Sequence, residues 1–121
     1  MQRGLILFAH GARDPGWADP FEALAERVRA LRPDIPVRLA YLELMTPDLG
    51  AAAAELIAGG VDGIRIVPIF LGQGGHLRRD LPERVAALRK KHPGIAFDCA
   101  PPAGEDAGVL DAIARFCVWD P

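Results

Sequence analysis

Residues 4–9 read GLILFA, a continuous apolar run that ends at His10-Gly11. Unbroken runs of this kind are typical of strands buried on both faces of a parallel sheet, whereas a strand with one solvated face alternates between apolar and polar residues. A similar but interrupted apolar character returns at residues 37–42, 64–70 and 95–99. The sequence therefore predicts four buried strands.

The segments that follow these strands have apolar residues at helical spacing, three and four positions apart. The first three carry a cap residue, a proline or both where the helix should begin. The expected starts are Asp19-Pro20, Thr46-Pro47, Asp80 and a position near Glu105. The order is therefore β-α-β-α-β-α-β-α. This order predicts an α/β fold in which a four-stranded parallel sheet, joined by right-handed crossovers, is flanked by helices on both faces as in flavodoxin-like layering.

The composition fits one ordinary globular domain over residues 1–121, because 50% of the residues are hydrophobic and 25% are charged. The formal net charge is −2, and the longest run of like charge is Arg89-Lys90-Lys91. No nucleic-acid or membrane partner is expected from this pattern. The run at residues 4–9 is too short for a secretory signal, so we expect a cytoplasmic protein.

Cys99 and Cys117 lack the paired spacing of a zinc site, and the chain is large enough to fold without a disulfide. We expect both to be reduced thiols without a metal or disulfide role. His92 lies at the end of the third expected helix, where the helix dipole accounts for it. It is therefore not counted among the candidate site residues.

In parallel α/β sheets, ligands bind beyond the carboxyl ends of the strands. His10 follows the first strand, Glu43 the second and His76 the third. Imidazole is both a common transition-metal ligand and a base near neutral pH, so two histidines converging with a carboxylate predict a site for a divalent ion. Each residue also has a structural interpretation. A histidine can cap a helix, and Glu43 can stabilise the dipole of the helix that follows it.

Residues 72–75 read GQGG directly before His76. Gly74 and Gly75 would let a ligand approach the backbone closely, although a tight turn without a ligand explains them equally well. Arg13, Arg78 and Arg79 flank the two histidines, and guanidinium groups recognise carboxylates. Arg13 and Arg78 are the predicted anchors for an acidic substrate, while at least one of Arg78 and Arg79 is expected to face solvent.

Three motifs in order make the family assignment more specific: LILFAHGARDP, AYLELMTPDL and VPIFLGQGGHLRRDLP. Together they resemble the short sirohydrochlorin cobaltochelatases and ferrochelatases of the class II chelatase fold. The resemblance runs from Gly4 to about Val85. One position departs from it, because the family usually has Ser or Thr where this chain has Ala12. The hydrogen bond of that hydroxyl is therefore missing.

The resemblance implies a lyase that inserts a divalent metal, cobalt or iron, into sirohydrochlorin on the route to cobalamin or sirohaem. His10 and His76 match the metal-binding histidines of the family, and Glu43 matches a carboxylate of its middle motif. Short members are similar to half of a bilobal chelatase and act as homodimers. No tightly bound cofactor is implied. Cobalt, iron or nickel would be the metal substrate, and the sequence does not select among them.

Two other functions fit part of the pattern. A phosphohydrolase or phosphomutase would use one histidine as nucleophile and Arg13 as phosphate clamp, but it would make less use of Glu43 and the Gly-Gly-His loop. A non-enzymatic protein that delivers divalent metal would use the same ligands without a macrocycle. A domain of this length is also too small to enclose a tetrapyrrole by itself, which favours a homodimer.

Overall fold

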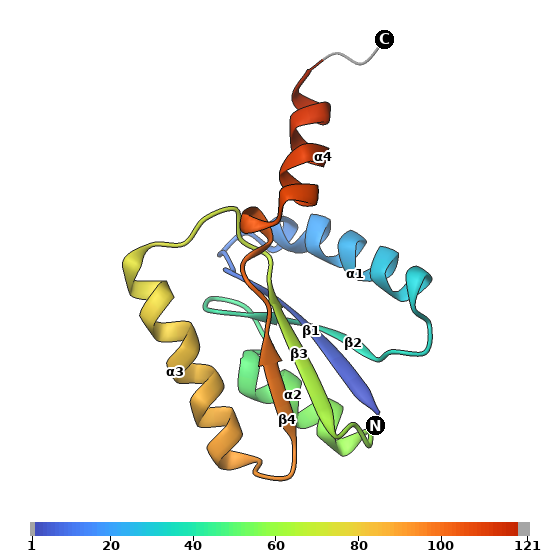
Figure 1. The fold of residues 1–121 in the computed structure, drawn as a ribbon, viewed down its shortest axis with the longest axis vertical. Helices are drawn as coiled ribbons and strands as arrows, with labels where there is room; N and C mark the ends of the chain where they lie inside the picture. The colour runs from blue at the N-terminus through green and yellow to red at the C-terminus, as the bar shows by residue number, and fades with distance from the viewer. Residues whose placement is uncertain (1, 119–121) are drawn as a thin grey trace.

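The computed structural model describes residues 2–118. Its four strands are β1 (Arg3–Ala9), β2 (Val37–Tyr41), β3 (Gly63–Pro68) and β4 (Ala96–Cys99). They form one parallel sheet in the order β2-β1-β3-β4 (Figure 1). In the central strand, Phe8 pairs with Ala40 on one side and with Pro68 on the other. The predicted α/β class and the parallel sheet are confirmed.

The four main helices are α1 (Asp19–Leu31), α2 (Leu49–Ala58), α3 (Gly75–Lys91) and α4 (Ala107–Cys117). Two short 3-10 helices, η1 (Pro15–Ala18) and η2 (Ala103–Glu105), precede α1 and α4. Helices α2 and α3 cover one face of the sheet and α1 covers the other, while α4 projects away from the body (Figure 1). No helix in the described part of the chain is long and apolar enough to cross a membrane.

The main core lies between the sheet and the α2–α3 layer. Ile6, Phe8 and Ile66 point into it from the two central strands and are completely buried. The unbroken apolar character of β1 follows from its position, because Leu7 on the opposite side packs against Ala25 of α1. Both faces of the central strand are therefore buried, as the run at residues 4–9 predicts.

Two expected helix starts differ from the structure. α2 begins at Leu49, because the carboxylate of Asp48 caps it by accepting a hydrogen bond from the Ala51 N–H at 2.8 Å. The Thr46-Pro47 pair belongs to the loop before it. α3 begins at Gly75, five residues earlier than the expected Asp80.

The earlier start of α3 has a packing cause. Its buried stripe begins at Leu77 and continues through Leu81 and Val85, so the apolar contact with the sheet extends upstream of Asp80. Pro82 lies inside the helix instead of in its first turn. The consequence for the site is that His76 stands in the first turn of a helix and not in a loop.

Candidate metal-handling site

The backbone beyond β1 and β2 brings His10 and Glu43 together. After the strands end, the Leu42 N–H donates to the Ala9 carbonyl at 2.9 Å and the Glu43 N–H donates to the His10 carbonyl at 3.1 Å. These two hydrogen bonds continue the parallel ladder between β1 and β2 beyond the last residue pair of the two strands. Glu43 therefore lies beside His10 although the two are 33 positions apart in the sequence (43 minus 10).

The two side chains face each other across this join. The Nε2 of His10 lies 3.4 Å from the Oε1 of Glu43, and both side chains are about half exposed, at 54% and 55%. The ring of Phe70 meets His10 edge-on, with ring centroids 6.4 Å apart. The histidine is thus held on one side by an aromatic ring and on the other by a carboxylate, while its exposed edge stays open to a ligand.

Gly11 makes the close approach of the two loops possible. Its φ is +94°, and a Cβ built on it would lie 1.9 Å from the carbonyl oxygen of Glu43. Only glycine fits there, for both conformational and steric reasons. On the other loop, Leu44 has a φ of +65°, which is strained for a residue with a branched side chain.

His76 lies in the first turn of α3, directly after Gly74, whose extended backbone caps the helix. It shares with His10 and Glu43 a cavity of about 540 Å³ at the carboxyl ends of the strands. The full lining is His10, Leu42, Glu43, Gly72, Gln73, Gly74, His76, Leu77, Asp80 and Arg84. Three candidate residues from three different strand ends are therefore brought to one cavity.

The cavity does not hold a complete set of metal ligands. Within residues 2–118, no three His, Cys, Asp or Glu side chains are close enough together to enclose one ion. His10 and Glu43 form a pair, and His76 stands elsewhere in the lining. This arrangement differs from a closed structural metal site, in which four protein ligands surround the ion.

The predicted substrate-binding residues divide into two groups. Gly74 lines the cavity, and Gly75 follows it as the first residue of α3. Arg13 is exposed in the loop after β1 and is not part of the lining. Arg78 lines a neighbouring groove of about 400 Å³ between α3 and β4, and Arg79 is exposed. Arg13 and Arg78, the two predicted substrate anchors, thus lie outside the cavity that holds the histidines.

Comparison with known proteins addresses the family directly. A family model described as CbiX matches residues 4–116. The chain belongs to the CbiX family. A sirohydrochlorin cobaltochelatase of Saccharolobus solfataricus is 35% identical over 118 residues, covering 93% of this chain and 91% of the relative. Another, from Sulfurisphaera tokodaii, is 28% identical and covers 91% of this chain and 87% of the relative.

Two solved structures share the fold of this chain over nearly its whole length. A cobalamin biosynthesis CbiX protein of Marinobacter aquaeolei VT8 superimposes with a TM-score of 0.84 at 33% identity, covering 94% of this chain and 92% of that one. The sirohydrochlorin chelatase SirB of Bacillus subtilis subspecies spizizenii, solved in complex with cobalt, gives a TM-score of 0.81 at 26% identity. The match covers 95% of this chain but only 49% of SirB.

The CbiX cavity also contains three polar residues that the sequence pattern does not predict for the site. Asp80 and Arg84 form an ion pair of 2.6 Å in its lining. They lie four and eight residues after His76, so all three share one face of α3. This spacing was available in the sequence, but it has meaning only if the helix begins before His76. Gln73 is the other missed residue, and its Oε1 is buried without a hydrogen-bond partner in the described chain.

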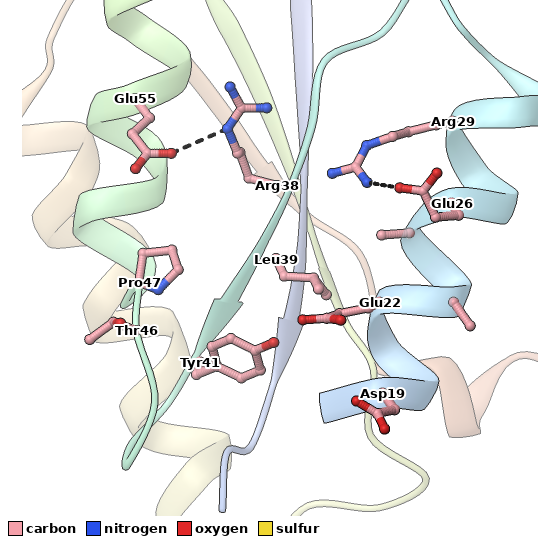
Figure 2. A pocket seen from close by; sticks show the side chains of 12 residues that line it. Asp19, Glu22, Glu26, Arg29, Arg38, Leu39, Tyr41, Thr46, Pro47 and Glu55 are labelled. Atoms are coloured by element: carbon pink, nitrogen blue, oxygen red, sulfur yellow. Dashed lines mark hydrogen bonds and ion pairs between the residues drawn. The ribbon is translucent and has the colours of Figure 1, made fainter. Parts of the chain in front are cut away.

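A second hollow, of about 650 Å³, lies between α1 and α2 at the open edge of β2 (Figure 2). Its arginines are engaged within the hollow, since Arg29 pairs with Glu26 and Arg38 pairs with Glu55. Burial and the nearby Glu22 raise the pKa of the Tyr41 phenol there. No histidine or cysteine lines this hollow. The candidate metal-handling site of this CbiX protein is therefore the cavity that holds His10, Glu43 and His76.

Proposed function

We propose that this chain inserts a divalent metal, cobalt or iron, into sirohydrochlorin. The observation that carries the proposal is the convergence of His10, Glu43 and His76 on one open cavity beyond the carboxyl ends of three strands. Membership of the CbiX family and similarity to proteins named sirohydrochlorin cobaltochelatases support the same activity. Nickel has similar ligand preferences and is a further candidate substrate.

Insertion replaces two pyrrole N–H protons of the macrocycle with one divalent cation. A site for this reaction has to release a metal ion and accept protons. His10 and His76 supply neutral imidazole nitrogens for both tasks, and Glu43 beside His10 supplies a carboxylate that can take a proton or hold the metal briefly. In this proposal the leaving protons pass to these side chains and from there to solvent.

The incomplete ligand set suits a metal that is passed on. Since the His10–Glu43 pair supplies only two donor groups, most coordination positions of a bound ion stay open to water or to the pyrrole nitrogens. A closed four-ligand site would retain its ion. The half-exposed His10 and exposed His76 can each contact an ion while the macrocycle approaches from the other side.

The glycines at the start of α3 leave room for the macrocycle. A Cβ at Gly72, Gly74 or Gly75 would meet no atom within 4 Å, so side chains there would fill open space at the cavity instead of clashing with the protein. Arg13 and Arg78 stand outside the lining and are proposed to bind the peripheral carboxylates of the substrate. In this proposal the peripheral carboxylates of the substrate reach beyond the histidines.

The proposed working unit is a homodimer. One chain corresponds to about half of the cobalt-bound SirB, of which it covers 49%. A second copy would supply the other half of the cleft. Closed two-fold dimers are the commonest assemblies of small soluble proteins.

The test is direct insertion. Purified protein is mixed with sirohydrochlorin and Co²⁺ or Fe²⁺, and the macrocycle absorption spectrum is followed against a protein-free blank, because cobalt also enters without enzyme. We expect the protein to accelerate the spectral change. A rate equal to the blank with both metals would contradict the proposal. Metal binding without acceleration would favour a metal-delivery role, and phosphate release from a phosphate ester would favour the hydrolase.

A further inference from the structure

Arg84 is the single Lys or Arg side chain among the described residues that line the metal-handling cavity. The same lining holds two carboxylates, Glu43 and Asp80. A substrate with carboxylates at its rim would be repelled by these two groups unless a positive charge offset them. An arginine supplies that charge at every working pH. The charge of Arg84 therefore favours the entry of an acidic molecule into this cavity.

Helix α3 places Arg84 on the cavity side and directs it toward the histidine end. His76, Asp80 and Arg84 follow one another at intervals of four residues, and such residues align along one side of an α-helix. Helical side chains tilt toward the N-terminus of their helix, so Arg84 leans back toward Asp80 and His76. At the ordinary helical rise, Arg84 starts about 12 Å along α3 from His76. This offset places a cation toward the rim of a ring whose centre faces His76.

The guanidinium group of Arg84 is only partly used within the described chain. Its Nε donates to the Oδ2 of Asp80 at 2.6 Å, and neither Nη1 nor Nη2 makes a hydrogen bond to another group of residues 2–118. A guanidinium group can hold a carboxylate along either of its edges. The contact with Asp80 thus leaves the Nη1–Nη2 edge free. The side chain of Arg84 is 40% exposed and that of Asp80 is 26% exposed, so the cation is the more accessible of the two.

Arg29 in the second hollow shows the opposite arrangement. Its Nη1 donates to Glu26 and its Nη2 donates to the Val37 carbonyl, so the protein itself occupies this edge (Figure 2). Arg84 makes its one contact through Nε and lines a cavity. A guanidinium group held at one end and free at the other is arranged to receive a ligand.

We propose that Arg84 binds a peripheral carboxylate of the tetrapyrrole through its Nη1–Nη2 edge while Asp80 occupies its Nε. A bidentate contact of this kind fixes direction as well as position, so it orients the macrocycle in the cavity. This anchor belongs to the cavity itself, whereas Arg13 and Arg78 lie outside its lining. The inference rests on the proposed function, because it takes the macrocycle as the occupant of the cavity.

A purely structural role is the competing interpretation of the Asp80–Arg84 pair. An acidic residue four positions before a basic one stabilises a helix slightly. A partly exposed ion pair contributes little to stability, because water screens it. A pair with this role alone would leave substrate binding unchanged. The two interpretations therefore differ in the affinity for the macrocycle and in the KM.

The first experiment measures the binding of metal-free sirohydrochlorin by the quenching of its fluorescence. Arg84→Gln is expected to raise the Kd about three- to tenfold, because a charge-assisted contact is lost at a partly exposed position. Arg84→Lys keeps the charge without the planar edge and is expected to give an intermediate Kd. The matched control is Lys90→Gln, which removes an exposed cation of α3 outside the cavity lining and is expected to keep the wild-type Kd. Far-UV circular dichroism checks the folding of each variant.

The insertion assay gives a second measurement of the same contact. Arg84→Gln is expected to raise the KM for sirohydrochlorin by a factor similar to that in Kd. The kcat and the Kd for Co²⁺ are expected to change less than about twofold, because the proposed partner of Arg84 is a substrate carboxylate and not the metal.

A further pair of variants separates a direct contact from simple neutralisation of Asp80. In Arg84→Gln the Asp80 carboxylate loses its partner, and its repulsion alone would weaken substrate binding. The substitution is therefore repeated on an Asp80→Asn background, where that carboxylate is absent. A direct contact predicts that Arg84→Gln still raises the Kd by about threefold or more on this background. The methyl ester of the macrocycle, tested in non-ionic detergent, has no free carboxylate and is expected to bind equally to wild type and Arg84→Gln.

Three outcomes would overturn the assignment of Arg84. These are an unchanged Kd and KM in Arg84→Gln, an effect that disappears on the Asp80→Asn background, and an equal loss of affinity for the methyl ester. A wild type that binds sirohydrochlorin without accelerating metal insertion would contradict the proposed function alone, and the Kd values would still decide on Arg84. A wild type that binds no macrocycle would contradict both.

Discussion

A Cβ on Gly11 would lie 1.9 Å from the carbonyl oxygen of Glu43, so the loop after β1 and the loop after β2 are in direct backbone contact. This contact places the His10 imidazole 3.4 Å from the Glu43 carboxylate. The glycine of the His-Gly pair therefore sets the geometry of the site. Any residue with a side chain at this position has to separate the two loops.

Gly11→Ala is expected to lower the free energy of unfolding by more than about 2 kcal/mol, because it adds both a positive-φ strain and a backbone collision. Gly60→Ala is the matched control. Gly60 also has a positive φ, of +104°, but a Cβ there would meet no atom within 4 Å, so a cost of about 1 kcal/mol is expected. Urea denaturation measures both. Equal losses would show that the Glu43 contact is relieved without cost.

His10→Ala and His76→Ala are each expected to fold and to lose most of the insertion activity, because neither side chain is buried in the core. If the two residues act as a unit, the double variant is expected to be little worse than the poorer single one. The measurement is the rate of the spectral change above the protein-free blank. His92→Ala, far from the cavity at the end of α3, is the control and is expected to keep its rate. Near-full activity in either single variant would return that histidine to a structural role.

Arg13→Ala is expected to raise the KM for sirohydrochlorin more than it weakens Co²⁺ binding, because its proposed partner is a substrate carboxylate. Arg32→Ala is a suitable control, since Arg32 is engaged with Asp34 at 2.8 Å, outside the cavity lining. Steady-state kinetics and Co²⁺ titration separate the two effects. Weaker Co²⁺ binding with an unchanged KM would overturn the assignment of Arg13.

Insertion is expected to fall as the pH drops through the range in which imidazole becomes protonated. Metal ligation needs the neutral ring, and the reaction itself releases protons, so both effects act in the same direction. The pH profile of the wild-type rate, corrected at each pH for the spontaneous reaction, measures the fall. A flat profile in the acid range would argue against histidine as ligand and proton acceptor.

Alkaline pH provides a separate test on stability. Burial, and then the nearby Glu22, raise the pKa of Tyr41 above the ordinary value of 10.0. The folded state holds the Tyr41 proton more tightly than the unfolded state does. The protonated phenol therefore contributes stability that is fully present below the unfolded pKa and is lost as pH rises through the folded pKa. Tyr41 is the single tyrosine of the chain, so tyrosinate absorbance reports on it alone. A midpoint at or below 10.0 in the folded protein would contradict the burial of this phenol.

Much of the fold follows from local sequence. The apolar run at residues 4–9 and its three weaker counterparts mark the strand positions correctly. Burial on both faces explains the unbroken run of β1, but the expectation of four buried strands is wrong for β4, in which only Phe97 is buried. The helix at residues 19–31 begins within one residue of the position that its Asp-Pro signal predicts, although Ala18 and not Asp19 is its cap residue. The family resemblance, carried by three motifs in order, is confirmed by the CbiX match. The roles of His10, Glu43 and His76 remain predictions.

Other features depend on contacts between distant segments. The start of α3 at Gly75 depends on Leu77 packing on the sheet, so the local signal at Asp80 does not predict it. The Asp80–Arg84 ion pair is not predicted for the same reason. The proximity of His10 to Glu43 depends on ladder bonds beyond the strand ends. The exposure of α4 has the same origin. Its sequence is amphipathic, but the Gly104 N–H before it donates to the Phe70 carbonyl, and no residue of α4 is buried in the described chain. Periodicity specifies which side of a helix is apolar, whereas the surface that covers it is set by where the chain is held.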